Sequence, residues 1–487
     1  MNKEILGLKP DRLWYYFAQI LQIPRPSKKE EKIVQYLLDF GRQHGLETLQ
    51  DEVGNVLIRK PATKGMENRK MVVLQSHVDM VCEKNNDVSF DFENDPIQAW
   101  IDGEWVKAKG TTLGADDGIG IAAQLAILEA GDLKHGPIEC LFTVDEETGL
   151  TGAFGLKPGF LKSSILLNLD SEDDGELFIG CAGGKDTLAE LSYTTEGTPG
   201  GHLGLRISIS GLLGGHSGDD ISKGRGNAVK LLNRILWHAA MHFGLRVNDF
   251  KGGNLRNAIA REAFASVVVP ADKKSSLLEY LKMFRKQVKA EYRITEPGLE
   301  VSYEDIDTPD TLIEKQAQDR LLNAIYSCPH GVIAWSAEIP NFVETSTNLA
   351  SVIVTDTKVV ITTSQRSSVE SAKDDICNMV ASVFMLAGAK VIHTDGYPGW
   401  TPNPNSMIVD LTSRIYKDLF NEEPKVLAIH AGLECGLIGD VYPEMDMISY
   451  GPTIKGAHSP DERLLINTVD KFWELTVKVL EEIPEGE

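Results

Sequence analysis

Apolar residues recur along the first part of the chain with two alternating periodicities. Residues 11–22 and 28–45 place them at three- and four-residue spacing, which predicts helices. Apolar runs with the composition of strands, or of one buried helix, follow: NVLIRK, KMVVLQSHVDMV, GIGIAAQLAILEAG, IECLFTVDEE and SSILLNLDSE. Strands separated by helices predict a doubly wound α/β sheet, in which functional sites gather at the C-terminal ends of the strands.

The pattern changes near residue 184. GHLGLRISISGLLGGHSG is a β-rich run punctuated by glycine, and GRGNAVKLLNRILWHAAMHFG has the spacing of a helix. Two stretches beginning at NAIAREAF and NLASVIVT each continue through a helix into a further strand. We therefore expect a second, α+β unit built from two β-β-α-β halves.

The stretch 395–405 is rich in Pro, Gly and Asn and predicts a turn or linker, after which the α/β pattern of the opening returns. The simplest organisation is one catalytic domain with a mixed, doubly wound sheet, formed by residues 1–183 and 400–487. Residues 184–399 are then an inserted α+β lid domain.

Composition narrows the class of protein. The 487 residues are 42% hydrophobic and 25% charged, which is ordinary for a globular chain. A formal net charge of −22 would repel phosphate backbones and anionic lipids, so neither nucleic acid nor membrane is an expected partner. We find no apolar leader or bilayer-length stretch and expect a cytoplasmic protein whose six scattered cysteines are buried thiols.

Two acidic motifs mark the first candidate site. In SHVDMV, His77 and Asp79 end an apolar strand on the same face, so Asp79 can orient the imidazole of a ligand histidine; a solvated strand end is the alternative. In GADDGIG, Asp116 and Asp117 open a helix. Helix capping accounts for Asp117, whereas Asp116 stands with further strand-end acids.

Those further acids are Glu146 and Glu147 after one apolar strand and Asp170 after another. Converging carboxylates repel one another and lose solvation, so they call for cations. We expect a dinuclear metal site, in which one carboxylate bridges ions about 3.5–4 Å apart and another stays uncoordinated to move protons. His458, in a loop of Gly, Pro, Ser and Asp, is the last candidate ligand, although a lone loop histidine is often only structural.

The motifs SHVDMV, GADDGIG, DEETG, NLDSE and GAHSPDE stand in the order found in the co-catalytic zinc peptidases, and the chain resembles that family of aminoacylases, carboxypeptidases and dipeptidases over nearly its whole length. GGHSGDDI, GGNLRNAIARE and HAGLECGLI resemble more narrowly its bacterial Xaa-His dipeptidase branch, which includes the cytosolic non-specific dipeptidases.

The resemblance implies two zinc ions per chain, although a site of nitrogen and oxygen ligands also accepts cobalt or manganese. Asp116 would bridge the ions, Glu146 would be the general base, and Asp79 would support His77. The remaining ligands would be His77 and Asp170 at one ion, and Glu147 and His458 at the other. No motif position departs from the family pattern, which argues against an inactive relative.

The resemblance also implies a small peptide substrate, a lid that closes about hinges near 184 and 399, and a homodimer through that lid. His216 is the candidate donor to the oxyanion, unless it is only part of a Gly-rich hairpin. Asn257 and Arg366 are candidates for the substrate's carbonyl and carboxylate, and Glu434 for its ammonium group.

Two other readings remain open. An N-acyl-amino-acid deacylase or carboxypeptidase would use the same metal ligands, but a deacylase has no ammonium group for Glu434 to bind. A peptide-binding or metal-storing module would keep the ligands without needing Glu146. Hydrolysis of dipeptides with a free amino terminus is the expected activity.

Overall fold

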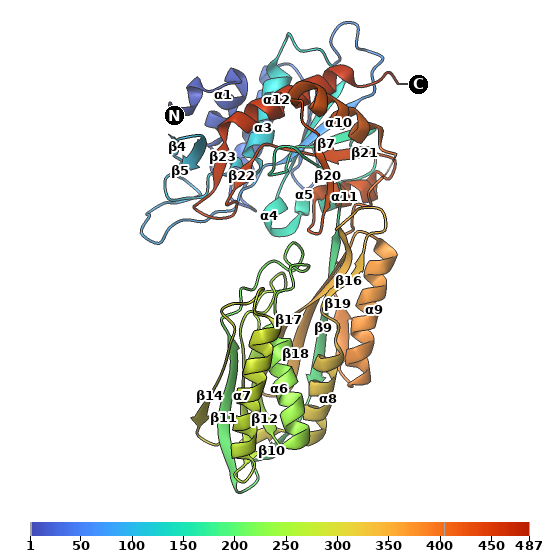
Figure 1. Ribbon diagram of the computed structural model, residues 1–487. Helices are drawn as coiled ribbons and strands as arrows, with labels where there is room; N and C mark the ends of the chain where they lie inside the picture. The colour runs from blue at the N-terminus through green and yellow to red at the C-terminus, as the bar shows by residue number, and fades with distance from the viewer. Residues whose placement is uncertain (1, 404, 487) are drawn as a thin grey trace. The chain divides into compact units, whose positions relative to one another are not determined.

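The computed structural model describes residues 2–403 and 405–486, so Pro404 in the expected turn lies outside the described residues. The chain divides into two compact units (Figure 1). Unit 1 comprises Met1–Gly180, Pro402–Ala428 and Leu433–Glu487, and unit 2 comprises Cys181–Thr401 and Ile429–Gly432.

Unit 1 is built on a mixed sheet with the strand order β1-β2-β6-β3-β7-β21-β8-β20. Strands β6, β3, β7 and β21 run parallel, whereas β1, β2 and β8 pair antiparallel with their neighbours. Every residue of β3 and β6 is buried. Because successive side chains point to opposite faces of a strand, both faces of this sheet are covered.

The elements of unit 1 carry the following bounds. Its helices are η1 (Ile5–Gly7), α1 (Asp11–Ile20), α2 (Glu31–Gln43), α3 (Ala115–Glu129), α4 (Glu146–Gly149), α5 (Thr151–Gly155), α10 (Met407–Phe420), α11 (Glu434–Val441) and α12 (Ile466–Glu482). Its strands are β1 (Glu47–Gln50), β2 (Val56–Lys60), β3 (Val72–His77), β4 (Ala99–Asp102), β5 (Trp105–Ala108), β6 (Ile138–Thr143), β7 (Ile165–Asn168), β8 (Glu176–Cys181), β20 (Lys425–Ile429), β21 (Asp446–Ser449), β22 (Ile454–Lys455) and β23 (Arg463–Leu465).

A smaller antiparallel sheet of unit 1 has the order β22-β23-β5-β4. It joins the end of the chain to residues near 100, with Leu464 opposite Val106 in the register. The loop between β22 and β23 carries His458, and the segment after β5 leads to Asp116 at the start of α3. The small sheet therefore places two distant candidate ligands at neighbouring loops.

Unit 2 contains a long antiparallel sheet with the order β14-β11-β13-β12-β17-β18-β9-β19, and β16 pairs with β17. Helices α6, α7, α8 and α9 lie along one side of it (Figure 1) and share a continuous apolar core with its strands. The halves β12-β13-α7-β14 and β17-β18-α9-β19 follow the same order of elements. Asn227 begins α6 as a side-chain cap, accepting a hydrogen bond from the amide of Lys230.

The elements of unit 2 have these bounds. Its helices are α6 (Ala228–His242), α7 (Lys274–Glu291), α8 (Lys315–Ser327) and α9 (Glu370–Leu386). Its strands are β9 (Gly183–Ser192), β10 (Thr195–Gly197), β11 (His202–Ser210), β12 (Arg246–Gly252), β13 (Ala263–Pro270), β14 (Glu300–Ile306), β15 (Thr311–Ile313), β16 (Gly331–Trp335), β17 (Val343–Val354), β18 (Lys358–Ser367) and β19 (Lys390–His393).

The predicted fold class, an α/β sheet domain with an inserted α+β part, is confirmed. Five of the six cysteines are buried, and Cys82 is partly exposed. Among the described residues, none of the helices combines the length and the apolar character that crossing a bilayer requires.

Candidate metal centre

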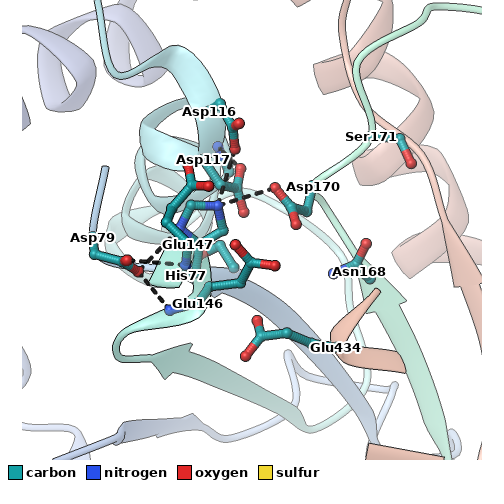
Figure 2. A network of polar contacts seen from close by, with 12 residues as sticks. His77, Asp79, Asp116, Asp117, Glu146, Glu147, Asn168, Asp170, Ser171 and Glu434 are labelled. Carbon is teal, nitrogen blue, oxygen red and sulfur yellow. Dashed lines mark hydrogen bonds and ion pairs between the residues drawn. The ribbon is translucent and has the colours of Figure 1, made fainter. Parts of the chain in front are cut away.

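Parallel strands β3, β6 and β7 bring the first candidate ligands to one edge of the main sheet. His77 is the last residue of β3 and lies opposite Thr143 of β6 in the register, while Gln75 lies opposite Asn168 of β7. The chain segments that continue from these strand ends carry the acidic residues of the site (Figure 2). Strand pairing alone therefore brings these residues together in space, although they are far apart in the sequence.

His77 is buried and its ring contacts three carboxylates. Its Nε2 lies 2.9 Å from Oδ1 of Asp116 and 3.3 Å from Oδ1 of Asp170, and its Nδ1 lies 3.4 Å from Oδ1 of Asp79 (Figure 2). The side chain of His77 is only 1% exposed. The imidazole therefore stands between a pair of potential co-ligands on one side and a supporting carboxylate on the other.

Asp116 joins the two histidines of the site. Its Oδ1 faces His77, and its Oδ2 lies 3.2 Å from Nε2 of His458. The backbone of Asp116 and Asp117 departs from helical geometry, so the first turn of α3 is a loop that turns the Asp116 carboxylate toward both rings. Asp117 accepts a hydrogen bond of 3.1 Å from the amide of Gly120, which is the capping contact expected of it.

Glu146 and Glu147 begin the short helix α4 after β6. Oε2 of Glu147 lies 3.1 Å from Nε2 of His458, and its Oε1 is buried without a hydrogen-bond partner. The amides of both glutamates donate to the two oxygens of Asp79, at 3.0 and 3.1 Å. One carboxylate thus supports His77 and also fixes the turn that carries two acidic side chains.

The donor set fits divalent metal ions. Two groups of side chains each bring their ligand atoms within 4.8 Å of one another, and both groups contain Asp116. They are His77, Asp116 and Asp170, and Asp116, Glu147 and His458. Imidazole nitrogens and carboxylate oxygens are the ligands that zinc and neighbouring metals accept, and a carboxylate common to two groups suits a pair of ions.

The pKa values of these groups also indicate that the site needs positive charge. Burial raises the pKa of Asp170 to about 7, since the attraction of His77 does not offset it. Hydrogen bonds to Asp116 and Glu147 raise the pKa of His458 to about 11. Burial would also raise the pKa of Asp116, but its bonds with His458 and His77 hold it below the usual value. Cationic partners therefore stabilise the ionised carboxylates here.

Glu434 lies in the same region, at the start of α11 (Figure 2). Its Oε2 accepts hydrogen bonds from Nε2 of Gln75 at 2.6 Å and from Oγ1 of Thr143 at 2.7 Å, and its Oε1 is buried without a hydrogen-bond partner. Burial raises the pKa of its carboxyl to about 7. A buried acid with one free oxygen is suited to receive a cationic group.

The remaining candidates lie in unit 2, where His216 and Arg366 are brought together. Nη2 of Arg366 lies 3.4 Å from Nε2 of His216, and its Nη1 donates to the hydroxyl of Tyr397 at 2.9 Å. Asn257 is exposed, and its backbone carbonyl accepts from the amide of Ser217 at 2.8 Å. Tyr397 went unnoticed in the sequence because it lies in the Pro- and Gly-rich stretch that predicts a turn.

Reasoning from the sequence also missed two buried charges beside the metal ligands, Arg25 and Glu462. Both hydrogen-bond to the loop that precedes Asp116. Glu462 closes the GAHSPDE motif, so its position four residues after His458 was a usable signal. Arg25 has no such signal, since IPRPS resembles an ordinary surface turn.

The chain is similar to known peptidases over nearly its whole length. The family model of peptidase family M20/M25/M40 matches residues 73–482. The chain is 47% identical over 481 residues to the cytosol non-specific dipeptidase of Escherichia coli (strain K12), and the match covers 99% of each chain. It is also similar to a solved structure, the aminoacylhistidine dipeptidase of Vibrio alginolyticus, with a TM-score of 0.92 and 46% identity over 99% of each chain.

A tripeptidase structure from Staphylococcus aureus has a TM-score of 0.57 and 16% identity, over 98% of this chain and 99% of that chain, which shows a shared fold alone. The family match covers most of the chain, and the relative from Escherichia coli spans nearly all of it. The resemblance seen in the motifs is therefore confirmed, and the chain belongs to peptidase family M20/M25/M40.

Proposed function

We propose that the chain is a metal-dependent dipeptidase that hydrolyses the peptide bond of dipeptides with a free amino terminus. The observation that carries the proposal is the carboxylate of Asp116, whose two oxygens face two imidazoles and which belongs to both ligand groups. Relatives named as a non-specific dipeptidase and as an aminoacylhistidine dipeptidase support the substrate class. Xaa-His peptides of the carnosine type are proposed substrates within a broad specificity.

The proposed metal centre holds two ions. His77 and Asp170 would bind one, Glu147 and His458 the other, and Asp116 both. When bound, such ions lower the pKa of a water molecule and polarise a carbonyl oxygen. We propose zinc, and the same nitrogen and oxygen donors would accept cobalt or manganese.

Glu146 is the proposed general base and acid. It can bring a carboxylate oxygen within 4.8 Å of ligand atoms of His77 and Glu147, and burial raises the pKa of its carboxyl well above the usual value. A carboxylate with a raised pKa accepts a proton near neutral pH and can release it again. Glu146 would take a proton from the attacking water and return it to the leaving amine.

Glu434 is the proposed partner of the substrate's ammonium group. A buried carboxylate without a cationic partner is costly, and an ammonium group would pair with its free Oε1. This requirement separates a dipeptidase from an N-acyl-amino-acid deacylase, whose substrates lack the positive charge. The presence of Glu434 therefore favours free dipeptides.

The roles proposed for unit 2 are those of a lid. His216 would donate to the oxyanion, Arg366 would pair with the substrate's carboxylate, and Asn257 would bind its carbonyl. Support comes from within unit 2, where Arg366 is 7% exposed and its guanidinium is held by Tyr397, which orients it for a planar, bidentate pair.

Location and assembly are also proposals. A cytoplasmic location is supported by the name of the Escherichia coli relative, and a homodimer through unit 2 by the resemblance to the family. A net charge of −22 disfavours nucleic acid and membrane surfaces as partners, so the proposed partner is a small peptide.

The test is hydrolysis of three substrates by zinc-loaded protein: alanyl-histidine, its N-acetylated form and an alanyl tripeptide. We expect the free dipeptide to be cleaved best, and Glu146→Gln to lower kcat by about 10²–10⁴-fold with unchanged metal content, because proton transfer is lost while the ligands stay. Glu139→Gln is the matched control, since Glu139 lies on β6, the strand that precedes Glu146, and binds Arg59 and the backbone of residues 162–163.

Preference for the N-acetylated form would replace the dipeptidase with a deacylase. Full activity of the Glu146→Gln variant would remove Glu146 from the mechanism. If no substrate were cleaved with zinc, cobalt or manganese, a peptide-binding role would take the place of catalysis.

A further inference from the structure

Asp116 and His458 are both proposed ligands of the second ion. They lie in two loops of unit 1 that are far apart in the sequence. Asp116 follows β5 through residues 109–115, and His458 lies between β22 and β23. These strands belong to the same small sheet, in which β23 pairs with β5. The sheet brings the loops together, but it ends several residues before either ligand, so something further has to set their final spacing.

Glu462 makes a direct link between these loops. It is the last residue before β23, its side chain is 2% exposed, and its two oxygens accept from four successive backbone amides. Oε2 accepts from Leu113 at 2.7 Å and Gly114 at 3.0 Å; Oε1 accepts from Ala115 at 2.8 Å and Asp116 at 3.4 Å. The carboxylate of one ligand loop therefore binds the backbone of the other, up to the ligand itself.

Arg25 holds the same loop from the opposite side. Its guanidinium donates to the carbonyl of Gly114 and to the carbonyls of Val78 and Asp79, and its side chain is 1% exposed. Gly114 thus has its N–H bound by Glu462 and its C=O bound by Arg25. A Cβ at Gly114 would lie 2.7 Å from Nη2 of Arg25, so the close approach needs glycine.

The two buried charges compensate each other without a direct ion pair between them. A buried carboxylate needs several donors to offset lost solvation, and four amides with a nearby guanidinium meet that need. Burying both charges costs solvation free energy. The bonds that they make fix the backbone directly before Asp116.

We propose that Glu462 is a positioning residue that sets the spacing of Asp116 and His458 and so preforms the ligand group Asp116, Glu147 and His458. The inference rests on the metal centre of the proposed function. Oδ2 of Asp116 has to lie near Nε2 of His458, now 3.2 Å away, while its Oδ1 stays 2.9 Å from His77. A loop free to shift by about 1 Å could not hold both contacts at once.

The experiment compares Glu462→Gln with Glu139→Gln in the full chain by cobalt titration, following the visible absorption of bound Co²⁺. Glu139 is the matched control because it is also a fully buried carboxylate that accepts two backbone amides, those of Lys162 and Ser163, both at 2.9 Å. In Glu462→Gln, the side-chain NH₂ faces amide donors and leaves two of them without an acceptor.

We expect Glu462→Gln to bind at least one cobalt ion about 10–100-fold more weakly than the wild type, which is the usual loss of affinity when a residue that supports a metal ligand is changed. The visible spectrum of the bound cobalt should also change. Glu139→Gln should lower the melting temperature and leave cobalt affinity unchanged. Glu462→Asp, which keeps the charge one methylene group further away, should bind cobalt with intermediate affinity.

Wild-type cobalt affinity and spectrum in Glu462→Gln would overturn the positioning role and leave the proposed function intact. Absence of cobalt binding by the wild type would instead refute the metal centre itself. If Glu462→Gln does not fold, Glu462→Asp decides by the same measurement, since wild-type affinity in that variant also overturns the inference.

Discussion

Asp79 receives hydrogen bonds from two other parts of the site besides its contact with His77. The amides of Glu146 and Glu147 and the hydroxyl of Ser27 donate to it, the last at 2.7 Å. Burial raises the pKa of Asp79, but its interactions with His77 and these donors outweigh burial and hold the pKa at about 2. An acid predicted to orient one histidine therefore also caps the turn that carries the proposed base.

Asp79→Asn should impair both functions. An asparagine has one acceptor oxygen, so one of the two glutamate amides loses its partner and the NH₂ group faces it. We expect kcat to fall about 10–100-fold and metal affinity to weaken within the same range, measured by steady-state hydrolysis and by metal analysis after dialysis. Ser27→Ala, which removes a single bond to the same carboxylate, should change either quantity far less; equal losses in the two variants would contradict the argument.

Glu434 can be tested through substrate charge. Wild-type protein should cleave alanyl-histidine at least tenfold better, in kcat/KM, than the analogue that lacks the amino group, because a buried carboxylate gains a charged partner. In Glu434→Gln this ratio should shrink toward one. Comparing the wild type and the variant on both substrates isolates the contribution of the ammonium contact. An unchanged ratio in the variant would mean that Glu434 has a structural role alone.

At the scale of elements, apolar runs predicted the strands that carry the site, but not the elements that bring their loops together. Strands β3 and β6 are long and buried throughout, so their pattern is strong. Strand β22 spans only Ile454–Lys455, and such a short segment has no periodicity to detect. Likewise KVLAIHAGLECGLI is one apolar run, whereas its middle, Ile429–Gly432, belongs to unit 2.

The turn between β6 and α4 offers a prediction at this scale. Asp145 has a left-handed backbone with φ of 50°, and its carboxylate accepts from the hydroxyls of Thr148 and Thr151. Asp145→Ala should destabilise the protein by about 2 kcal/mol, because alanine tolerates this φ poorly and both bonds are lost. Thermal melting should show a fall of about 4–8 °C.

That variant should also lose activity, since Glu146 and Glu147 follow directly on the altered turn. Asp145→Asn is its control, because asparagine tolerates the left-handed region and keeps an acceptor. A stable, fully active Asp145→Ala protein would show that α4 is positioned by the Asp79 contacts alone.

At the scale of the whole molecule, the candidate ligands are spread over most of the chain, from His77 to His458. The sequence predicted His77, Glu146, Glu147 and Asp170 from their positions after apolar strands, because the ends of parallel strands meet at the same edge of a sheet. His458 could be assigned only through the family resemblance, since its place depends on pairing between β23 and β5. No local pattern encodes that pairing.

Because so many acidic residues gather at the site, metal binding should depend on pH, and so should the stability of the whole protein. Burial raises the pKa of Glu434 and Asp170 to about 7 and of Glu172 to about 8, and hydrogen bonds raise that of His458 to about 11. Each group binds its proton more tightly in the folded state. Their contribution to stability is complete below their ordinary pKa values and is lost as pH rises through the raised ones.

Buried histidines of unit 2 act in the opposite sense at lower pH. Burial lowers the pKa of His330 to about 4 and of His430 to about 3, so they favour folding as pH rises toward about 6.5 and add nothing further above it. In chelator, the melting temperature of the protein should therefore fall between pH of about 6.5 and 8. Over this range the site acids and His458 hold protons in the folded state that they release on unfolding, so stability falls as pH rises.

Divalent ions replace those protons, so the rise in melting temperature that they cause should grow with pH. At a free ion concentration of ~100 Kd the gain is about 2.7 kcal/mol, and Kd itself falls as the ligands lose their protons. Differential scanning calorimetry in chelator and in zinc, at pH of about 5.5, 6.5 and 8, measures the difference directly, and the histidines of unit 2 cancel from it. A metal-induced shift that is largest at the lowest pH would mean that protons and metal ions do not compete for Asp170 and His458.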